Sequence, residues 1–316
     1  MNLIAYLGFI LAAYSVIAND VIQTLGTFLA SNQKRKWYWL WLFAGGLLSI
    51  VLLYGWYSNF GDVSYGRLSK IPMPEHIGLL FLLPPICLLV ITRFGIPIST
   101  TFMILTVFSA GQIIEKMVVK SLLGYGISFL VSISLYYFIA QVLERPASIK
   151  KLANSGNEKF WYVGQWLSTG FLWAQWLIQD FANIYVYLPR SLSIVEVLGS
   201  LFILLVMLAI IFKQKGGKIQ KVVTNKTNSD NIRSATIIDL CYGIVLFFFT
   251  NINTVPMSTT WAFIGILAGR EIAIRFKLKD KIQNKVYKII FWDLTKVMIG
   301  LVLSVLLAYL IIYINA

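Results

Sequence analysis

The chain of 316 residues has the composition of a protein that lies in a membrane. Hydrophobic residues make up 58% of it, charged residues 13%, and the mean hydropathy is +0.76. Soluble domains carry about 25% charged residues, so this composition excludes a soluble globular protein. With two cysteines and one histidine, the chain has no disulfide framework, no multi-histidine metal centre and no histidine-based triad.

Ten apolar segments follow one another along the chain, and most reach the roughly 20 residues that a membrane-spanning helix needs. We predict them at 3–30, 37–57, 77–93, 97–115 and 118–143, and then at 161–188, 192–212, 236–251, 256–273 and 287–314. The third segment of each set of five is short, and a turn leads from it directly into the fourth. Segments three and four of each set are therefore predicted to form a re-entrant helical hairpin, which is tolerated only inside protein or beside a water-filled cavity.

Two polar landmarks recur in the same order. Asn19-Asp20 precedes a Pro-x-Ser-Thr-Thr element at 97–101, and Asp180 precedes a second such element at 256–260. The two aspartates are 160 residues apart and the two prolines 159. Nearly equal offsets indicate an internal duplication.

The duplication divides the chain into two halves of five segments each. We predict a first inverted repeat at 1–143, a cytoplasmic linker at 144–160 and a second inverted repeat at 161–316. An odd number of segments gives the two copies opposite orientations, as in many secondary transporters, whose substrate site lies between the repeats near the midplane. The predicted fold class is an all-α polytopic membrane protein.

Lysine and arginine are distributed unevenly between the two sides of the predicted membrane. Alternating sides at each segment gives 21 on one side and 5 on the other. Because cytoplasmic loops are enriched in these residues, the rich side faces the cytoplasm and both termini lie outside. The net charge of +14 is thus interpreted as loop charge and not as a nucleic-acid surface. We predict a multi-pass protein of the cell (inner) membrane, with 213–235 as a flexible cytoplasmic loop.

The two Pro-x-Ser-Thr-Thr elements carry residue types suited to an anion. Proline is tolerated at the first position of a helix, where the following free N–H groups and the helix dipole favour negative charge. Hydroxyl groups add neutral donors. Two such helix starts, brought together by the repeat symmetry, would hold one small tetrahedral oxyanion. The predicted substrate-binding residues are Asn19, Ser99, Thr100, Thr101, Asn183, Ser258, Thr259 and Thr260.

The two aspartates, Asp20 and Asp180, imply a cation as well. Two carboxylates repel an anion, and no Arg or Lys occurs in the four motifs to neutralise them. We therefore predict that Na⁺, H⁺ or a metal ion lies between them and the substrate. Gln23 and Gln179 are the further predicted cation ligands. No catalytic residue, resident metal or cofactor is predicted, since the coupling ion is a co-substrate.

A purely structural interpretation remains open for any one of these residues. Ser and Thr in membrane helices also bond to their own backbone, and Asn can join helices. The complete set, duplicated in order and spacing, favours function. Asp239 has no counterpart in the other half, and it is interpreted either as a group near an interface or as a further part of cation coupling.

At these residues the chain resembles the inorganic phosphate transporter (PiT) family, as a divergent member. The family pattern is Gly-Ala-Asn-Asp-Val-Ala-Asn followed by Pro-x-Ser-Thr-Thr-His, once in each inverted half. Ala18-Asn19-Asp20-Val21 fits it well, and both Pro-x-Ser-Thr-Thr elements match fully. Asp180-Phe181-Ala182-Asn183 fits less well. Among the departures are Phe102 and Trp261 in place of the histidines and Gln23 and Gln179 in place of asparagines.

The resemblance implies a secondary transporter that couples inorganic phosphate to Na⁺ or H⁺ by alternating access. The expected partners are phosphate, the coupling cation and the lipid bilayer, with a homodimer left open and no nucleic acid. One alternative is a transporter of sulfate or another oxyanion, and another is a non-transporting membrane protein on a decayed transporter fold. A membrane enzyme lacks a visible nucleophile, base or metal cluster.

Overall fold

The computed structural model describes residues 3–93, 98–109, 111–143, 158–216, 232–277 and 284–315. Helices are the only regular elements within these ranges. The elements of the first half are α1 (Leu3–Val16), η1 (Ile17–Val21), α2 (Ile22–Ser31), α3 (Trp37–Ser58), η2 (Arg67–Lys70), η3 (Leu79–Leu82), α4 (Leu83–Arg93), η4 (Thr101–Leu105), η5 (Thr106–Phe108) and α5 (Gly111–Leu143). Those of the second half are α7 (Glu158–Tyr185), α8 (Ile194–Lys213), α10 (Ile232–Ile252), α11 (Thr259–Lys277) and α12 (Asn284–Asn315).

Five stretches of helix are long and apolar enough to cross a membrane, counted over the described residues. They are Leu3–Val21, Trp37–Ser58, Ile113–Tyr137, Ile194–Lys213 and Ala235–Ile252. Large apolar side chains on several of them face outward, such as Tyr54 on α3 and Phe202 on α8, which are 64% and 68% exposed. The protein is therefore an all-helical, multi-pass membrane protein, as the composition predicts.

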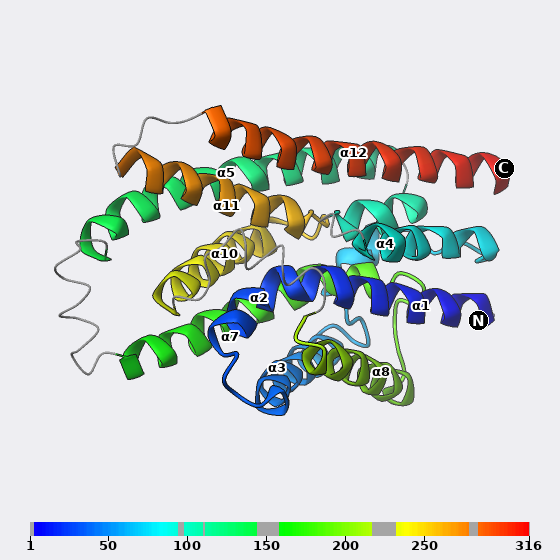
Figure 1. Cartoon of the computed structure of the whole chain (residues 1–316). Helices are drawn as coiled ribbons and strands as arrows, with labels where there is room; N and C mark the ends of the chain where they lie inside the picture. Colours follow the sequence, from blue (N-terminus) through cyan, green and yellow to red (C-terminus); the bar gives the residue numbers. More distant parts are fainter. Residues whose placement is uncertain are drawn as a thin grey trace.

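Figure 1 shows the helices arranged along one direction, with both ends of the chain at the same end of the molecule. The helices α5 and α12 are the longest, with 33 and 32 residues, and both extend across the middle of the molecule (Figure 1). In contrast, α4 lies in the half nearer the chain termini, and α10 and α11 lie in the other half (Figure 1). Elements from opposite ends therefore meet near the middle, where residues 98–101 and 257–260 contact each other.

Close packing fixes α11 against α5. A Cβ built on Gly265 would lie 2.5 Å from the Tyr125 carbonyl oxygen, and one on Gly269 would lie even closer to that of Phe129. Small residues four apart allow membrane helices to approach closely, and dispersion contacts then hold them together. The Ser132 hydroxyl adds a hydrogen bond of 2.7 Å to a carbonyl oxygen of α11.

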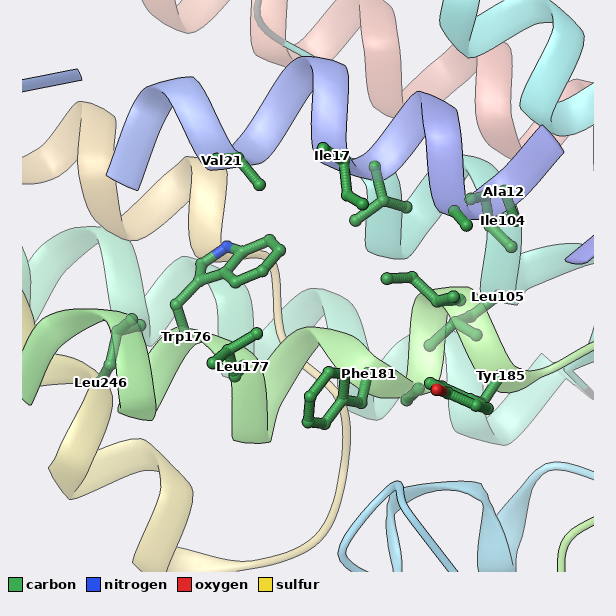
Figure 2. Packing of buried hydrophobic residues seen from close by; sticks show 14 of the residues in the cluster. Ala12, Ile17, Val21, Ile104, Leu105, Trp176, Leu177, Phe181, Tyr185 and Leu246 are labelled. Carbon is green, nitrogen blue, oxygen red and sulfur yellow. The ribbon is translucent and has the colours of Figure 1, made fainter. Parts of the chain in front are cut away.

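Part of the hydrophobic core lies between the first helix and α7. Side chains of α1, η1 and α7 point toward one another, with Ile104 and Leu105 of η4 between them (Figure 2). Ile17, Leu177 and Phe181 are almost completely buried there. This packing places the two π-helical turns, η1 in the first helix and η4, next to α7.

Several predicted boundaries are wrong. The boundary predicted between the segments 97–115 and 118–143 lies earlier in the structure. The fourth segment ends with η5 at Phe108, and the fifth is one helix of 33 residues, α5, that begins at Gly111. The hydroxyls of Thr106 and Ser109 bond to carbonyl oxygens four residues back, and Ser109 then adopts an extended conformation that ends the helix. The short segment predicted at 236–251 is part of a 21-residue helix, α10, which begins earlier at Ile232.

The predicted linker and loop fall mostly outside the described residues. Residues 144–157 of the linker do so, whereas its last three residues form the start of α7. Residues 217–231 of the basic loop also lie outside, as does Pro97. The division into repeats at 143 and 161 stays a prediction.

Candidate functional site

Asn19 and Asp20 occupy a break in the first helix. Residues Ile17–Val21 form a π-helical turn between α1 and α2, so the α-helical hydrogen-bond pattern is interrupted at the polar pair. Such turns are rare and are frequent at functional sites. Both side chains are buried, with exposures of 0% and 1%. The sequence marks Asn19-Asp20 as a polar pair within one apolar segment, and the structure shows that the α-helix is interrupted there.

Three side chains donate hydrogen bonds to the Asp20 carboxylate. Thr100 Oγ1 donates to Oδ2 at 2.5 Å, Asn19 Nδ2 to Oδ1 at 2.7 Å and Gln23 Nε2 to Oδ1 at 3.3 Å. The Asn19 amide also donates to the Ile98 carbonyl oxygen at 2.8 Å. The first helix is thereby joined directly to the first Ser-Thr-Thr element, although the two lie about 80 residues apart in the chain.

Asn183 on α7 extends this network into the second half. Its Nδ2 donates to Asp180 Oδ1, to Thr100 Oγ1 at 3.1 Å and to Thr101 Oγ1 at 3.2 Å. Thr100 therefore contacts both Asp20 and Asn183. A continuous set of hydrogen bonds connects the two predicted cation-binding aspartates.

The two Ser-Thr-Thr elements also contact each other in a reciprocal way. Thr101 Oγ1 donates to the Met257 carbonyl oxygen at 3.1 Å, and its counterpart Thr260 donates to the Ile98 carbonyl oxygen at 3.3 Å. The two residues that replace histidine in the family pattern meet as well, since the rings of Phe102 and Trp261 lie 5.7 Å apart.

The start of each element differs from the predicted helix start. α11 begins at Thr259, and Ser258 accepts a hydrogen bond from the Trp261 N–H as an N-cap does. Pro256 precedes the helix by three residues, so its predicted place at the first helical position is wrong. Ser99 accepts from the Phe102 N–H in the same way, but the π-helical turn η4 follows it. Both serine hydroxyls keep a hydrogen to donate.

Four buried oxygen atoms in this network accept no hydrogen bond of normal distance and angle. They are Asn19 Oδ1, Gln23 Oε1, Asp180 Oδ2 and Asn183 Oδ1. Buried acceptors are almost always satisfied, and each one left alone costs about 1–3 kcal/mol. All four belong to residues that the sequence predicts to bind the substrate or a cation. Amide and carboxylate oxygens are the ligand type that hard cations take.

All the predicted site residues are buried, with at most 5% exposure. The structure joins most of them through the contacts given above. Thr259 is the first residue of α11; its side chain hydrogen-bonds with Asp180, and its carbonyl oxygen accepts a hydrogen bond of 2.8 Å from Tyr242. Gln179 is engaged elsewhere, because its Oε1 accepts from Arg67 at 3.1 Å and its Nε2 donates to Thr250 at 3.0 Å.

Sequence reasoning missed Arg67 and Tyr242. Arg67 lies in the connection between the segments predicted at 37–57 and 77–93, where an exposed side chain is expected, yet it is only 2% exposed. It interacts electrostatically with Asp180, and Tyr242 does so with both site aspartates. Neither residue belongs to a repeated motif, so the sequence offered no signal for them.

Asp239 forms a separate buried cluster. Thr27 and Thr169 each donate to its carboxylate at 2.5 Å, one to each oxygen. Its polar atoms are thus satisfied by two other helices, α2 and α7. This pattern agrees with an interhelical contact better than with a ligand site.

Comparisons with known proteins give one result at the level of fold. No model of a protein family matches the chain, and no curated protein matches it either. Its fold is similar to that of a solved structure described as "The sodium-dependent phosphate transporter", with a TM-score of 0.61 and 18% sequence identity over 98% of each chain. The fold that the PiT resemblance implies is therefore confirmed across nearly the whole chain.

Proposed function

We propose that this protein is a secondary active transporter that carries inorganic phosphate together with Na⁺. The observation that supports this most directly is the set of four unpartnered buried oxygens on Asn19, Gln23, Asp180 and Asn183. They lie in one network with the threonine hydroxyls of the first Ser-Thr-Thr element. A site that offers oxygen ligands and hydroxyl donors together suits a cation and an oxyanion bound side by side.

The ligand types favour Na⁺ over H⁺. Three of the four unpartnered oxygens belong to side-chain amides. An amide oxygen accepts hydrogen bonds or coordinates a cation, but it does not take up a proton near neutral pH. A proton would use only the carboxylates and would leave the amide oxygens unsatisfied. The protein of similar fold is described as a sodium-dependent phosphate transporter, which agrees with this choice of ions.

Two inverted halves, 1–143 and 161–316, would enclose this site. Matching elements of the two halves make matching contacts, since α1 packs on α4 as α7 packs on α10. In the same way η4 and η5 pack on α12 as α11 packs on α5. Alternating access would come from one bundle rocking against the other around the buried site. The basic loops would face the cytoplasm, with both termini outside.

Uptake into proteoliposomes tests the proposal. The full chain is reconstituted, and radiolabelled phosphate and sulfate are offered with an inward Na⁺ gradient, with a pH gradient or with neither. The proposal expects phosphate uptake that requires Na⁺. Sulfate uptake alone would favour the other oxyanion transporter. A phosphate-dependent rise in melting temperature without any flux would favour a non-transporting protein.

A further inference from the structure

The loop between α3 and η3 directs Arg67 into the protein. Asp62 accepts hydrogen bonds from the backbone N–H groups of Ser64 at 2.7 Å and Gly66 at 2.8 Å. Gly66 has a φ of 75°, a left-handed conformation that glycine adopts without steric cost. The turn that this creates leads straight into η2, where Arg67 is the first residue. The loop is therefore organised in advance to hold one inward-pointing arginine.

The Arg67 guanidinium is buried but incompletely satisfied. The residue is 2% exposed, its Nε donates to Gln179 Oε1 at 3.1 Å, and its Nη2 is buried without a partner. A buried charged donor that lacks an acceptor is strongly unfavourable. An arginine held in this way needs a further acceptor to offset the cost of its burial.

Asp180 does not supply that acceptor. Asp180 attracts Arg67 electrostatically, yet neither Asp180 Oδ2 nor Arg67 Nη2 has a hydrogen bond of normal distance and angle. The two atoms are therefore not bonded to each other, although both are buried and their charges are opposite. A ligand pair with a negative and a positive member would satisfy both, with the anion at Arg67 and the cation at Asp180.

A second buried basic residue, Lys120, differs from Arg67 because all of its donors have acceptors. Its Nζ donates to the carbonyl oxygens of Asn253 at 3.1 Å and Val255 at 2.7 Å, and to Asn253 Oδ1 at 3.0 Å. All three ammonium donors are thus used in fixing the segment before the second Ser-Thr-Thr element. Of these two basic residues, Arg67 is the one that has a buried donor without an acceptor.

We propose that Arg67 is a substrate-binding residue whose Nη2 donates to an oxygen of the transported oxyanion, beside the cation bound at Asp180. This inference rests on the proposed function. The planar guanidinium suits phosphate oxygens because its donors are fixed in a fork and always charged. With Nε on Gln179 and Nη2 on the anion, Arg67 would connect the substrate to α7 of the second half.

The test compares phosphate and Na⁺ dependence of uptake in three variants. Arg67→Gln removes the charge, Arg67→Lys keeps it but loses the fork, and Arg190→Gln is a matched control. Arg190 is a half-buried arginine that donates to the carbonyl oxygens of Val186, Leu188 and Ile71, none of which is a predicted site residue. Its Nε is buried without a partner, so it also controls for an unsatisfied guanidinium nitrogen. Phosphate-dependent shifts in melting temperature in detergent give a second readout.

For Arg67→Gln we expect the KM for phosphate to rise about 10- to 100-fold, because a hydrogen bond to a charged group is lost. For Arg67→Lys we expect a smaller rise, and in both the Na⁺ concentration for half-maximal uptake stays within about threefold. Arg190→Gln keeps the wild-type KM. If Arg67→Gln does not fold, the KM of Arg67→Lys for phosphate tests the inference by itself.

An unchanged phosphate KM in the Arg67 variants would overturn the inference. So would a change confined to Na⁺ dependence, since it would mean that Arg67 only balances the charge of Asp180. These results are distinct from failure of the proposed function, in which the wild-type protein itself would show neither phosphate uptake nor a phosphate-dependent shift in melting temperature.

Discussion

Replacing Asp20 by asparagine removes the negative charge of the side chain and keeps its size and shape. Asparagine keeps an oxygen that can accept from the Asn19 and Gln23 amides, which donate to Asp20 Oδ1 at 2.7 Å and 3.3 Å. The fold should therefore persist. The cation, in contrast, loses a charged partner. Two unit charges about 4 Å apart attract by about 4 kcal/mol at an effective dielectric constant of about 20, which corresponds to about a thousandfold in affinity.

We expect Asp20→Asn to abolish Na⁺-stimulated phosphate uptake in proteoliposomes while expression and elution in detergent stay as in the wild type. Asp239→Asn is the matched control, because Asp239 is equally buried and also accepts short hydrogen bonds, but from Thr27 and Thr169 outside the site. The control should keep its Na⁺ stimulation. Uptake by Asp20→Asn with the wild-type Na⁺ dependence would refute the role of Asp20. Loss of Na⁺ stimulation in the control would assign cation coupling to Asp239 instead.

Two further substitutions test the network and the packing around it. Thr100→Val removes the hydroxyl that donates to the site carboxylate and accepts from Asn183, so we expect phosphate affinity to fall about 10- to 100-fold in uptake assays; wild-type affinity would show that the contact is dispensable. Gly265→Ala places a Cβ 2.5 Å from the Tyr125 carbonyl oxygen and should destabilise the protein by about 1–3 kcal/mol in thermal unfolding. Gly126→Ala, which meets nothing within 4 Å, is its control, and equal melting temperatures would contradict the packing.

The central part of the site could be predicted because its motifs occur in both halves of the sequence, in the same order and at nearly the same spacing. Asn19 and Asp20 on the first helix, and Asn183 on α7, meet the first Ser-Thr-Thr element as the duplication suggests. Polar groups inside an apolar segment are costly unless they have partners or a function, so their positions stand out in sequence. The π-helical turn at Ile17–Val21 could not be predicted from the sequence, since it depends on the packing around it, and α7 continues unbroken past Asp180 and Asn183.

The rest of the site depends on tertiary structure. Arg67 lies on a loop that resembles any polar connection, and only the folding of that loop buries its side chain. Gln179 appeared equivalent to Gln23 in sequence, but its oxygen accepts from this arginine. The position of the break before α5 was also not predictable, because it follows from hydroxyl-to-backbone hydrogen bonds of Thr106 and Ser109 that a helix interior could equally have accommodated.

The most direct test of the whole account is Na⁺-dependent binding and uptake of phosphate by the purified full chain. In proteoliposomes, an inward Na⁺ gradient should drive radiolabelled phosphate to an internal concentration above the external one, and collapsing the gradient should release it. Accumulation that is indifferent to Na⁺, or none at all in vesicles that contain folded protein, would contradict the claim that the buried oxygens between Asp20 and Asp180 bind the coupling ion.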